Sequence, residues 1–147
     1  MTEQPIRILG IDPGKKRVGL AIGNNVLYIA SAFKTIEYGS KERFINSLRS
    51  IVMEEEIELI VIGLPKNMDG TEGESANFSR RLAELVKEEL KIEVELVDER
   101  LSTVEAIKQL HQVGEKVGKS KGKIDMLSAA VILQSYLDNR KRLLEND

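Results

Sequence analysis

Residues 6–23 read IRILGIDPGKKRVGLAIG, and this stretch decides how the chain folds. Two apolar runs, residues 6–11 and 18–22, flank the short polar turn Pro13-Gly14-Lys15-Lys16-Arg17. Runs of this length that are rich in Ile and Val and bounded by Pro and Gly are typical of strands. Because only a few residues separate the two runs, the pattern predicts a β-hairpin.

Asp12 is the unusual residue of this hairpin, since it follows a strand that we expect to be buried. A buried carboxylate costs free energy unless it is paired, hydrogen-bonded or bound to a metal. Asp before Pro-Gly is also favourable turn chemistry, so by itself Asp12 is best explained as a turn residue. The alternative is a metal ligand or catalytic carboxylate at the edge of a sheet.

Composition restricts the class of protein. The 147 residues predict a single domain over residues 1–147. The net charge of −2 argues against a uniformly basic coat for nucleic acid but allows a local basic groove. The chain has no Cys, which excludes disulfides, thiolate zinc sites and cysteine nucleophiles, and the single His111 disfavours multi-histidine metal sites. With no signal-peptide layout and no apolar run long enough to span a membrane, we expect a soluble cytoplasmic protein.

The rest of the chain predicts strands that alternate with helices. The expected strands cover residues 28–36, 59–63 and 92–97, and the expected helices cover residues 41–55, 77–90, 102–113 and 123–144. Ser40 is the expected N-cap of the first helix, and Ser102 with Glu105 forms a capping box at the third. Residues 64–75 are expected to form a polar loop and residues 114–122 a mobile one.

This order predicts a three-layer α/β fold with a mixed sheet. An antiparallel meander of three strands is followed by strands that crossover helices place parallel to the first. Ligands of open α/β sheets gather beyond the carboxyl ends of the parallel strands. Asp12 and Glu99 both fall at such ends, and Asp125 falls in the first turn of the last predicted helix.

Each of these three acids also has a structural explanation. Asp98 and Glu99 could simply pair with Arg100 at the surface, and Asp125 could be a first-turn acid favoured by the helix dipole. Taken together they are harder to dismiss, because the topology can bring all three to one edge of the sheet. A carboxylate cluster without His or Cys suits hard divalent cations, which offset the repulsion between like charges.

Basic residues neighbour these acids in the sequence. They are Lys15, Lys16, Arg17, Arg100, Lys116, Lys119, Lys121 and Lys123. Each run could be a solvated turn, but adjacency to the acids suggests a polyanion laid across a metal site. Since the chain has only six Phe and Tyr and no Trp, we expect contacts with phosphates and helical shape rather than base stacking.

Two familiar motifs are rejected. Residues 114–120, GEKVGKS, are one residue short of a Walker A loop and do not follow a strand. The glycines at positions 10, 14 and 19 do not fit the dinucleotide-binding fingerprint, and their turn leads to a strand rather than a helix. His111, within a predicted helix, is interpreted as structural or surface-exposed.

Four motifs, in order along the chain, resemble the YqgF family of small, Holliday-junction-resolvase-like nucleases assigned to maturation of the 5′ end of 16S rRNA. They are GIDPGKKRVGLAI (10–22), IGLPKNMDGTEG (62–73), VDERLSTVEA (97–106) and KIDMLSAAVIL (123–133). The resemblance implies an RNase H-like fold, a five-stranded mixed sheet of order 3-2-1-4-5 with strand 2 antiparallel, flanked by helices.

The resemblance also implies Asp12, Glu99 and Asp125 as catalytic, metal-binding acids that hold two Mg²⁺ or Mn²⁺ ions. The family motif favours Glu99 over its neighbour Asp98. Gly63 fits independently: if its strand lies between the strands that carry Asp12 and Glu99, a glycine there leaves room between the two acids. The substrate implied is pre-16S rRNA or another structured RNA, held by Lys15, Lys16, Arg17, Arg100, Lys121 and Lys123.

Three rival functions use the same residues or the same fold. A Holliday-junction resolvase would act on branched DNA as a stable homodimer, whereas the nuclease could be a monomer or a homodimer. An ATP-binding protein with this sheet normally needs two such lobes, and 147 residues supply one. An RNA-binding ribosome-assembly factor would keep the fold without turnover, although the presence of all three acids argues against it.

Overall fold

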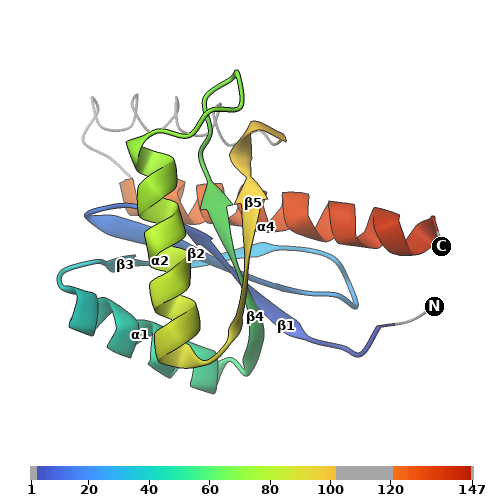
Figure 1. Cartoon of the computed structure of the whole chain (residues 1–147). Helices are drawn as coiled ribbons and strands as arrows, with labels where there is room; N and C mark the ends of the chain where they lie inside the picture. The colour runs from blue at the N-terminus through green and yellow to red at the C-terminus, as the bar shows by residue number, and fades with distance from the viewer. Residues whose placement is uncertain (1–2, 102–120, 147) are drawn as a thin grey trace.

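The computed structural model describes residues 3–101 and 121–146 and contains alternating strands and helices (Figure 1). In chain order the elements are β1 (Arg7–Asp12), β2 (Arg17–Asn24), β3 (Ser31–Glu37), α1 (Lys41–Glu54), β4 (Ile57–Leu64), α2 (Glu74–Leu90), β5 (Glu93–Asp98), the short 3-10 helix η1 (Glu99–Leu101) and α4 (Lys121–Glu145). The helix predicted over residues 102–113, its capping box, His111, Lys116 and Lys119 lie outside the described residues.

The five strands form one sheet in the order β3-β2-β1-β4-β5. β2 is antiparallel to both of its neighbours, whereas β1, β4 and β5 are parallel to one another. The strand order, the mixed sheet and the antiparallel second strand are therefore confirmed. Because β1 lies between β2 and β4, its last residue, Asp12, has a neighbouring strand on either side.

Helices cover both faces of the sheet, with α1 and α2 on one face and α4 on the other (Figure 1). Each face has its own apolar core. Leu9 and Ile11 of β1 belong to the core under α1 and α2, whereas Ile8 belongs to the core under α4. Since side chains alternate along a strand, Asp12 falls on the α4 face, in step with Ile8 and Gly10. In the described part of the chain no helix has the length and apolar character needed to cross a membrane.

Three glycines of β1 and β2 allow α4 to lie directly on the sheet. A Cβ added at Gly19 would overlap the backbone carbonyl of Asp125. Added at Gly10 it would lie 2.7 Å from the Leu133 Cβ, well inside van der Waals contact. Gly23 is less crowded, because its added Cβ would be 3.0 Å from the nearest atoms. These glycines therefore serve the close approach of a helix, and Gly10 and Gly19 are two of those that did not fit the dinucleotide-binding fingerprint.

Element boundaries differ from the predictions at two places that matter for the site. α4 is described from Lys121, two residues before the predicted start, and it has no acid in its first turn. The first-turn helix-dipole explanation for Asp125 is therefore wrong. Lys121 and Gly122, predicted as loop, belong to the helix, and the Gly122 carbonyl accepts a hydrogen bond from Thr35 Oγ1 at 2.5 Å.

β3 starts at Ser31, three residues later than predicted, because Asn24 organises a turn before it. The Asn24 side-chain carbonyl accepts hydrogen bonds from the backbone N–H groups of Val26 and Leu27, and its backbone carbonyl accepts one from Tyr28. Tyr28 has a φ of 57°, which no strand residue adopts. Ser40 caps α1 as predicted, accepting a hydrogen bond from the Arg43 N–H.

The N-terminal segment is tied to α4 by Glu3 and Arg140, whose Nε lies 3.0 and 2.9 Å from the two Glu3 carboxylate oxygens. We expect Glu3→Gln to lower the free energy of unfolding at pH 7 by about 1 kcal/mol, because the pair is bidentate and partly buried. The hydrogen bond from Arg140 holds the pKa of Glu3 below its usual 4.5.

A carboxyl group whose pKa is lowered by folding stabilises the protein above its unfolded pKa and loses that effect as pH falls through the folded pKa. The deficit of Glu3→Gln should therefore be complete at pH 7 and fade below pH 4.5. Urea unfolding at about pH 7 and about pH 3.5 measures it. A deficit of equal size at both pH values would contradict the assignment.

Candidate active site

The three predicted acids are buried at the edge of the sheet where β1 and β5 end. Asp12 closes β1, Glu99 opens η1 directly after β5, and Asp125 lies in α4. Their exposed fractions are 9%, 6% and 7%, and among the described residues no other acid is buried. Since burying a carboxylate is costly, three of them at one sheet edge indicate a functional site.

Two glycines connect these acids through the sheet. Gly19 of β2 is paired with Asp12, and it is Gly19 whose missing side chain makes room for the Asp125 backbone. On the other side, β4 pairs with β1 as far as Ile62 and Ile11, so Gly63 lies beside Asp12. A Cβ added at Gly63 would be 3.2 Å from the Glu99 carboxyl carbon. Asp12 therefore lies between Gly19 and Gly63. Asp125 packs over Gly19, and Glu99 packs over Gly63.

The predicted role of Gly63 is confirmed by this arrangement. β4 separates the strands that carry Asp12 and Glu99, and a Cβ added at position 63 would meet Ile132 Cδ1 at 2.7 Å and the Glu99 side chain from 3.2 Å. Gly19 is a second glycine of the same kind, which was not singled out from the sequence. The available signal was the spacing of Gly19 and Gly23, which places both on one face of a strand.

The structure separates Glu99 from its neighbour Asp98. Asp98 continues the face of Leu96, which packs under α1 and α2, whereas Glu99 follows the face of Val97, which packs against α4. Asp98 is bonded to Arg100, with 2.8 Å between Arg100 Nη2 and Asp98 Oδ2, and this hydrogen bond holds the pKa of Asp98 below its usual value. The surface pair expected for this segment is therefore formed by Asp98, and Glu99 turns inward.

Asp125 is bonded to Arg17, one of the predicted phosphate-binding residues. Arg17 Nε donates to Asp125 Oδ2 at 2.9 Å, and the Arg17 side chain is 31% exposed. Arg17 lies two residues before Gly19 in β2 and hence on the α4 face. The helix turn that carries Asp125 is also fixed to β3 by the hydrogen bond from Thr35 to Gly122. Neither Thr35 nor the pairing of Arg17 with Asp125 was predicted.

The other predicted basic residues fall into two groups. Lys15, Lys16 and Lys123 are exposed, and Lys15 makes a long contact of 3.7 Å with Glu74. Arg100 is engaged within the protein, by Asp98 and, at 3.4 Å, by the carbonyl of Met68. Lys121 is the first residue of α4, and its side chain lies outside the described structure.

The loop between β4 and α2 is closed by its own hydrogen bonds. Asp69 accepts from the backbone N–H of Thr71 at 2.9 Å and from its hydroxyl at 2.6 Å, which lowers the pKa of Asp69. Gly70 has a φ of 90°, as a tight turn requires. Met68 at the tip is 82% exposed. The loop thus contains an ordered turn attached to Arg100 near the acid edge.

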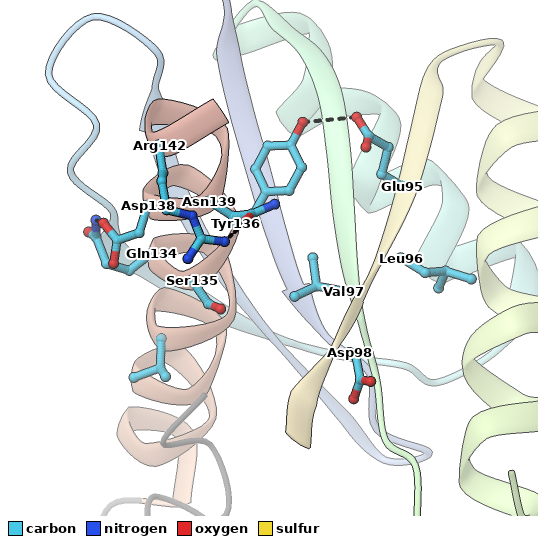
Figure 2. A pocket seen from close by; sticks show the side chains of 11 residues that line it. Glu95, Leu96, Val97, Asp98, Gln134, Ser135, Tyr136, Asp138, Asn139 and Arg142 are labelled. Atoms are coloured by element: carbon cyan, nitrogen blue, oxygen red, sulfur yellow. Dashed lines mark hydrogen bonds between the residues drawn. The ribbon is translucent and has the colours of Figure 1, made fainter. Parts of the chain in front are cut away.

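A cleft of about 880 Å³ lies elsewhere, between β5 and α4 (Figure 2). Figure 2 shows Tyr136 of α4 reaching across to Glu95 of β5, a hydrogen bond of 2.9 Å. Burial, together with this bond, raises the pKa of Tyr136 to about 12. None of the three buried acids lines the cleft, although Asp98 does. The cleft is therefore distinct from the candidate active site.

The donor chemistry of the three acids suits a divalent metal. Carboxylate oxygens are the ligands that Mg²⁺ and Mn²⁺ prefer, and glycines at positions 19 and 63 keep side chains from intruding between the acids. Within residues 3–101 and 121–146, no three acidic or histidine side chains converge closely enough to hold an ion in this conformation. The Asp125 carboxylate is instead bonded to Arg17.

The fold is RNase H-like, as two solved structures show. The *Thermus thermophilus* RuvC structure in complex with a Holliday junction aligns with a TM-score of 0.58 and 13% identity, covering 92% of this chain and 96% of that one. The fowlpox virus resolvase in complex with Holliday junction DNA aligns with a TM-score of 0.58 and 12% identity, covering 92% and 99%. At such identities these likenesses concern the fold.

The chain belongs to the RuvX family, whose model, described as "Holliday junction resolvase", matches residues 6–139. A relative from *Anaeromyxobacter* is 41% identical over 92% of this chain and 98% of its own length. A relative from *Clostridium botulinum* is 44% identical over 90% and 97%. Both carry the name "Putative pre-16S rRNA nuclease". The resemblance to this family is confirmed, and the chain is accordingly a nuclease, a hydrolase of phosphodiester bonds.

Proposed function

We propose that this protein is a metal-dependent nuclease that processes the 5′ end of pre-16S rRNA during ribosome biogenesis in the cytoplasm. One observation supports the metal-dependent chemistry: the described chain buries three carboxylates, Asp12 and two others that each pack over a glycine beside it. The names of relatives that are more than 40% identical support ribosomal RNA as the substrate.

In this proposal the three carboxylates hold the metal. Asp12, in the middle of the three, would hold the metal together with Glu99 and Asp125. When bound, Mg²⁺ or Mn²⁺ ions supply an activated water and stabilise the leaving 3′ oxygen, which gives 5′-phosphate and 3′-hydroxyl ends. The protein contributes the spacing of the acids, since Gly19 and Gly63 bring Asp125 and Glu99 over the sheet.

Exposed lysines are the proposed contacts for the RNA backbone. Lys15 and Lys16 are in the hairpin after Asp12, and Lys123 is two residues before Asp125, so all three adjoin the acids. Lys121, Arg17 and Arg100 remain candidates, but both arginines are already bonded to carboxylates. Lysines in solvent bind phosphates as point charges without first breaking an internal ion pair.

We expect the double variant Lys15→Gln/Lys16→Gln to bind structured RNA about tenfold more weakly, because two phosphate contacts are removed. For the same reason the slope of the logarithm of the RNA-binding constant against the logarithm of salt concentration should fall in magnitude by about 1 to 2. Binding titrations at several salt concentrations measure both. The matched control is Lys87→Gln/Lys91→Gln, two exposed lysines at the end of α2 away from the acids. Equal losses in the two double variants would contradict a local interface.

The function is tested with a 5′-extended 16S rRNA precursor fragment and a four-way DNA junction, each offered Mg²⁺, Mn²⁺ or EDTA. Wild type and Asp12→Asn are compared, with circular dichroism to show that both fold. Metal-dependent cutting of the RNA that is absent in Asp12→Asn supports the proposal. Binding of RNA without cutting by either protein would instead favour a non-catalytic assembly factor.

Holliday-junction resolution is the second candidate, favoured by the description of the matching family. It uses the same acids, so the substrate rather than the site separates the two functions. Symmetric cutting of the junction, with the precursor RNA left intact, would make it primary. Sedimentation adds an independent criterion, because a resolvase must place two acid sites on one junction and so act as a stable dimer, whereas a monomer counts against it.

A further inference from the structure

Arg17 occupies an unusual position for a surface arginine. It projects from β2 on the α4 face, two residues before the glycine that is paired with Asp12, and its Nε lies 2.9 Å from Asp125 Oδ2. The Asp125 side chain is only 9% exposed, so the pair lies where water screens it poorly. Arg17 thus brings a fixed positive charge to the acid site.

The backbone around Asp125 is held in place by other contacts. Gly19 packs against the Asp125 backbone, and Thr35 donates a hydrogen bond to the Gly122 carbonyl one turn earlier. These contacts come from β2 and β3, and neither depends on the Arg17 side chain. The Asp125 carboxylate can therefore change partners by rotating its side chain, while helix α4 stays where it is.

We propose that Arg17 is the resident cation of this acid site: it holds the Asp125 carboxylate in the absence of metal and competes with the divalent ion for it. This inference rests on the proposed metal-dependent function. Three buried carboxylates repel one another, and a guanidinium bonded to one of them offsets part of that repulsion. An incoming ion must then displace Arg17 or share Asp125 with it, so Arg17 weakens metal binding and stabilises the metal-free protein.

The role differs from the phosphate contact expected from the sequence. A phosphate-binding arginine would affect affinity for RNA and leave metal affinity unchanged. A resident cation sets metal affinity in the absence of any nucleic acid. Because a unit charge a few ångströms away in a poorly screened site changes ion binding by about tenfold or more, the two roles are separable by measurement.

The test is calorimetric titration of Mn²⁺ into the full-length protein without nucleic acid, at a pH where the carboxylates are ionised. The variants are Arg17→Gln, Arg17→Lys, Asp12→Asn and Lys16→Gln, the last removing an exposed charge next to Arg17 as the matched control. We expect Arg17→Gln to bind Mn²⁺ about tenfold more tightly, Arg17→Lys and Lys16→Gln to stay within about twofold of wild type, and Asp12→Asn to bind more weakly.

Thermal unfolding is the second readout. Arg17→Gln should melt below wild type in EDTA, and this deficit should shrink or reverse with saturating Mn²⁺, because tighter binding adds stability. Equal or weaker Mn²⁺ binding by folded Arg17→Gln would overturn the inference while leaving the proposed function intact, since wild type would still bind the metal more tightly than Asp12→Asn. If wild type and Asp12→Asn bound Mn²⁺ equally poorly, the proposed metal site itself would fail, and the inference with it.

Discussion

Gly19→Ala should lower the free energy of unfolding by about 3 kcal/mol or more and abolish nuclease activity, although Ala is ordinarily the better residue in a strand. The added methyl group would overlap the backbone carbonyl of Asp125, and backbone cannot move aside as the end of a side chain can. α4 would have to shift away from β2, which loosens the core beneath it and displaces Asp125 from Asp12. Urea unfolding followed by circular dichroism measures the loss.

Other glycines provide a graded control. A Cβ added at Gly10 would press on the Leu133 Cβ at 2.7 Å, one at Gly23 on its neighbours at 3.0 Å, and one at Gly73 would meet nothing within 4 Å. We therefore expect the loss of stability to decrease in the order Gly19→Ala, Gly10→Ala, Gly23→Ala, Gly73→Ala, with the last within about 1 kcal/mol of wild type. Wild-type stability in Gly19→Ala would contradict the close approach of α4.

Glu99→Gln should reduce metal-dependent cleavage by more than about 100-fold, which exceeds the loss usual for a residue that only supports a metal ligand. The change keeps the size of the side chain over Gly63 and removes its charge, so the fold should persist. Cleavage rates at saturating metal, together with the rise in melting temperature that the metal produces, measure the effect. Both should be strongly reduced.

Asp98→Asn is the matched control for Glu99→Gln. It removes one carboxylate from the adjacent position, but on the opposite face of β5 and in a partly exposed ion pair with Arg100. Such a pair contributes about 1 kcal/mol or less, so cleavage by Asp98→Asn should stay within about threefold of wild type. If Asp98→Asn were inactive and Glu99→Gln active, the assignment of the acid after β5 would be reversed.

Much of the fold could be predicted because local rules govern it. The buried run over β4, the capping of α1 by Ser40 and the short hairpin after Asp12 each depend on neighbouring residues, and all three are confirmed. Predictions failed where a distant or unusual contact overrode the pattern. β3 starts late because Asn24 folds the chain back before it, and residues 121–122, predicted as loop, are helical where Thr35 bonds the Gly122 carbonyl.

The sequence by itself determined which chemistry this protein carries: acids at the ends of predicted strands, no Cys, a single His, and motifs of one nuclease family. These follow from residue types and short-range periodicity. Only the tertiary structure decided how those residues are used. It turns Glu99 inward and Asp98 outward, pairs Arg17 with Asp125 across 108 positions, and places Gly19 under α4. Such contacts depend on how α4 packs on the sheet, and a packing interaction between segments this far apart leaves no local pattern in the sequence.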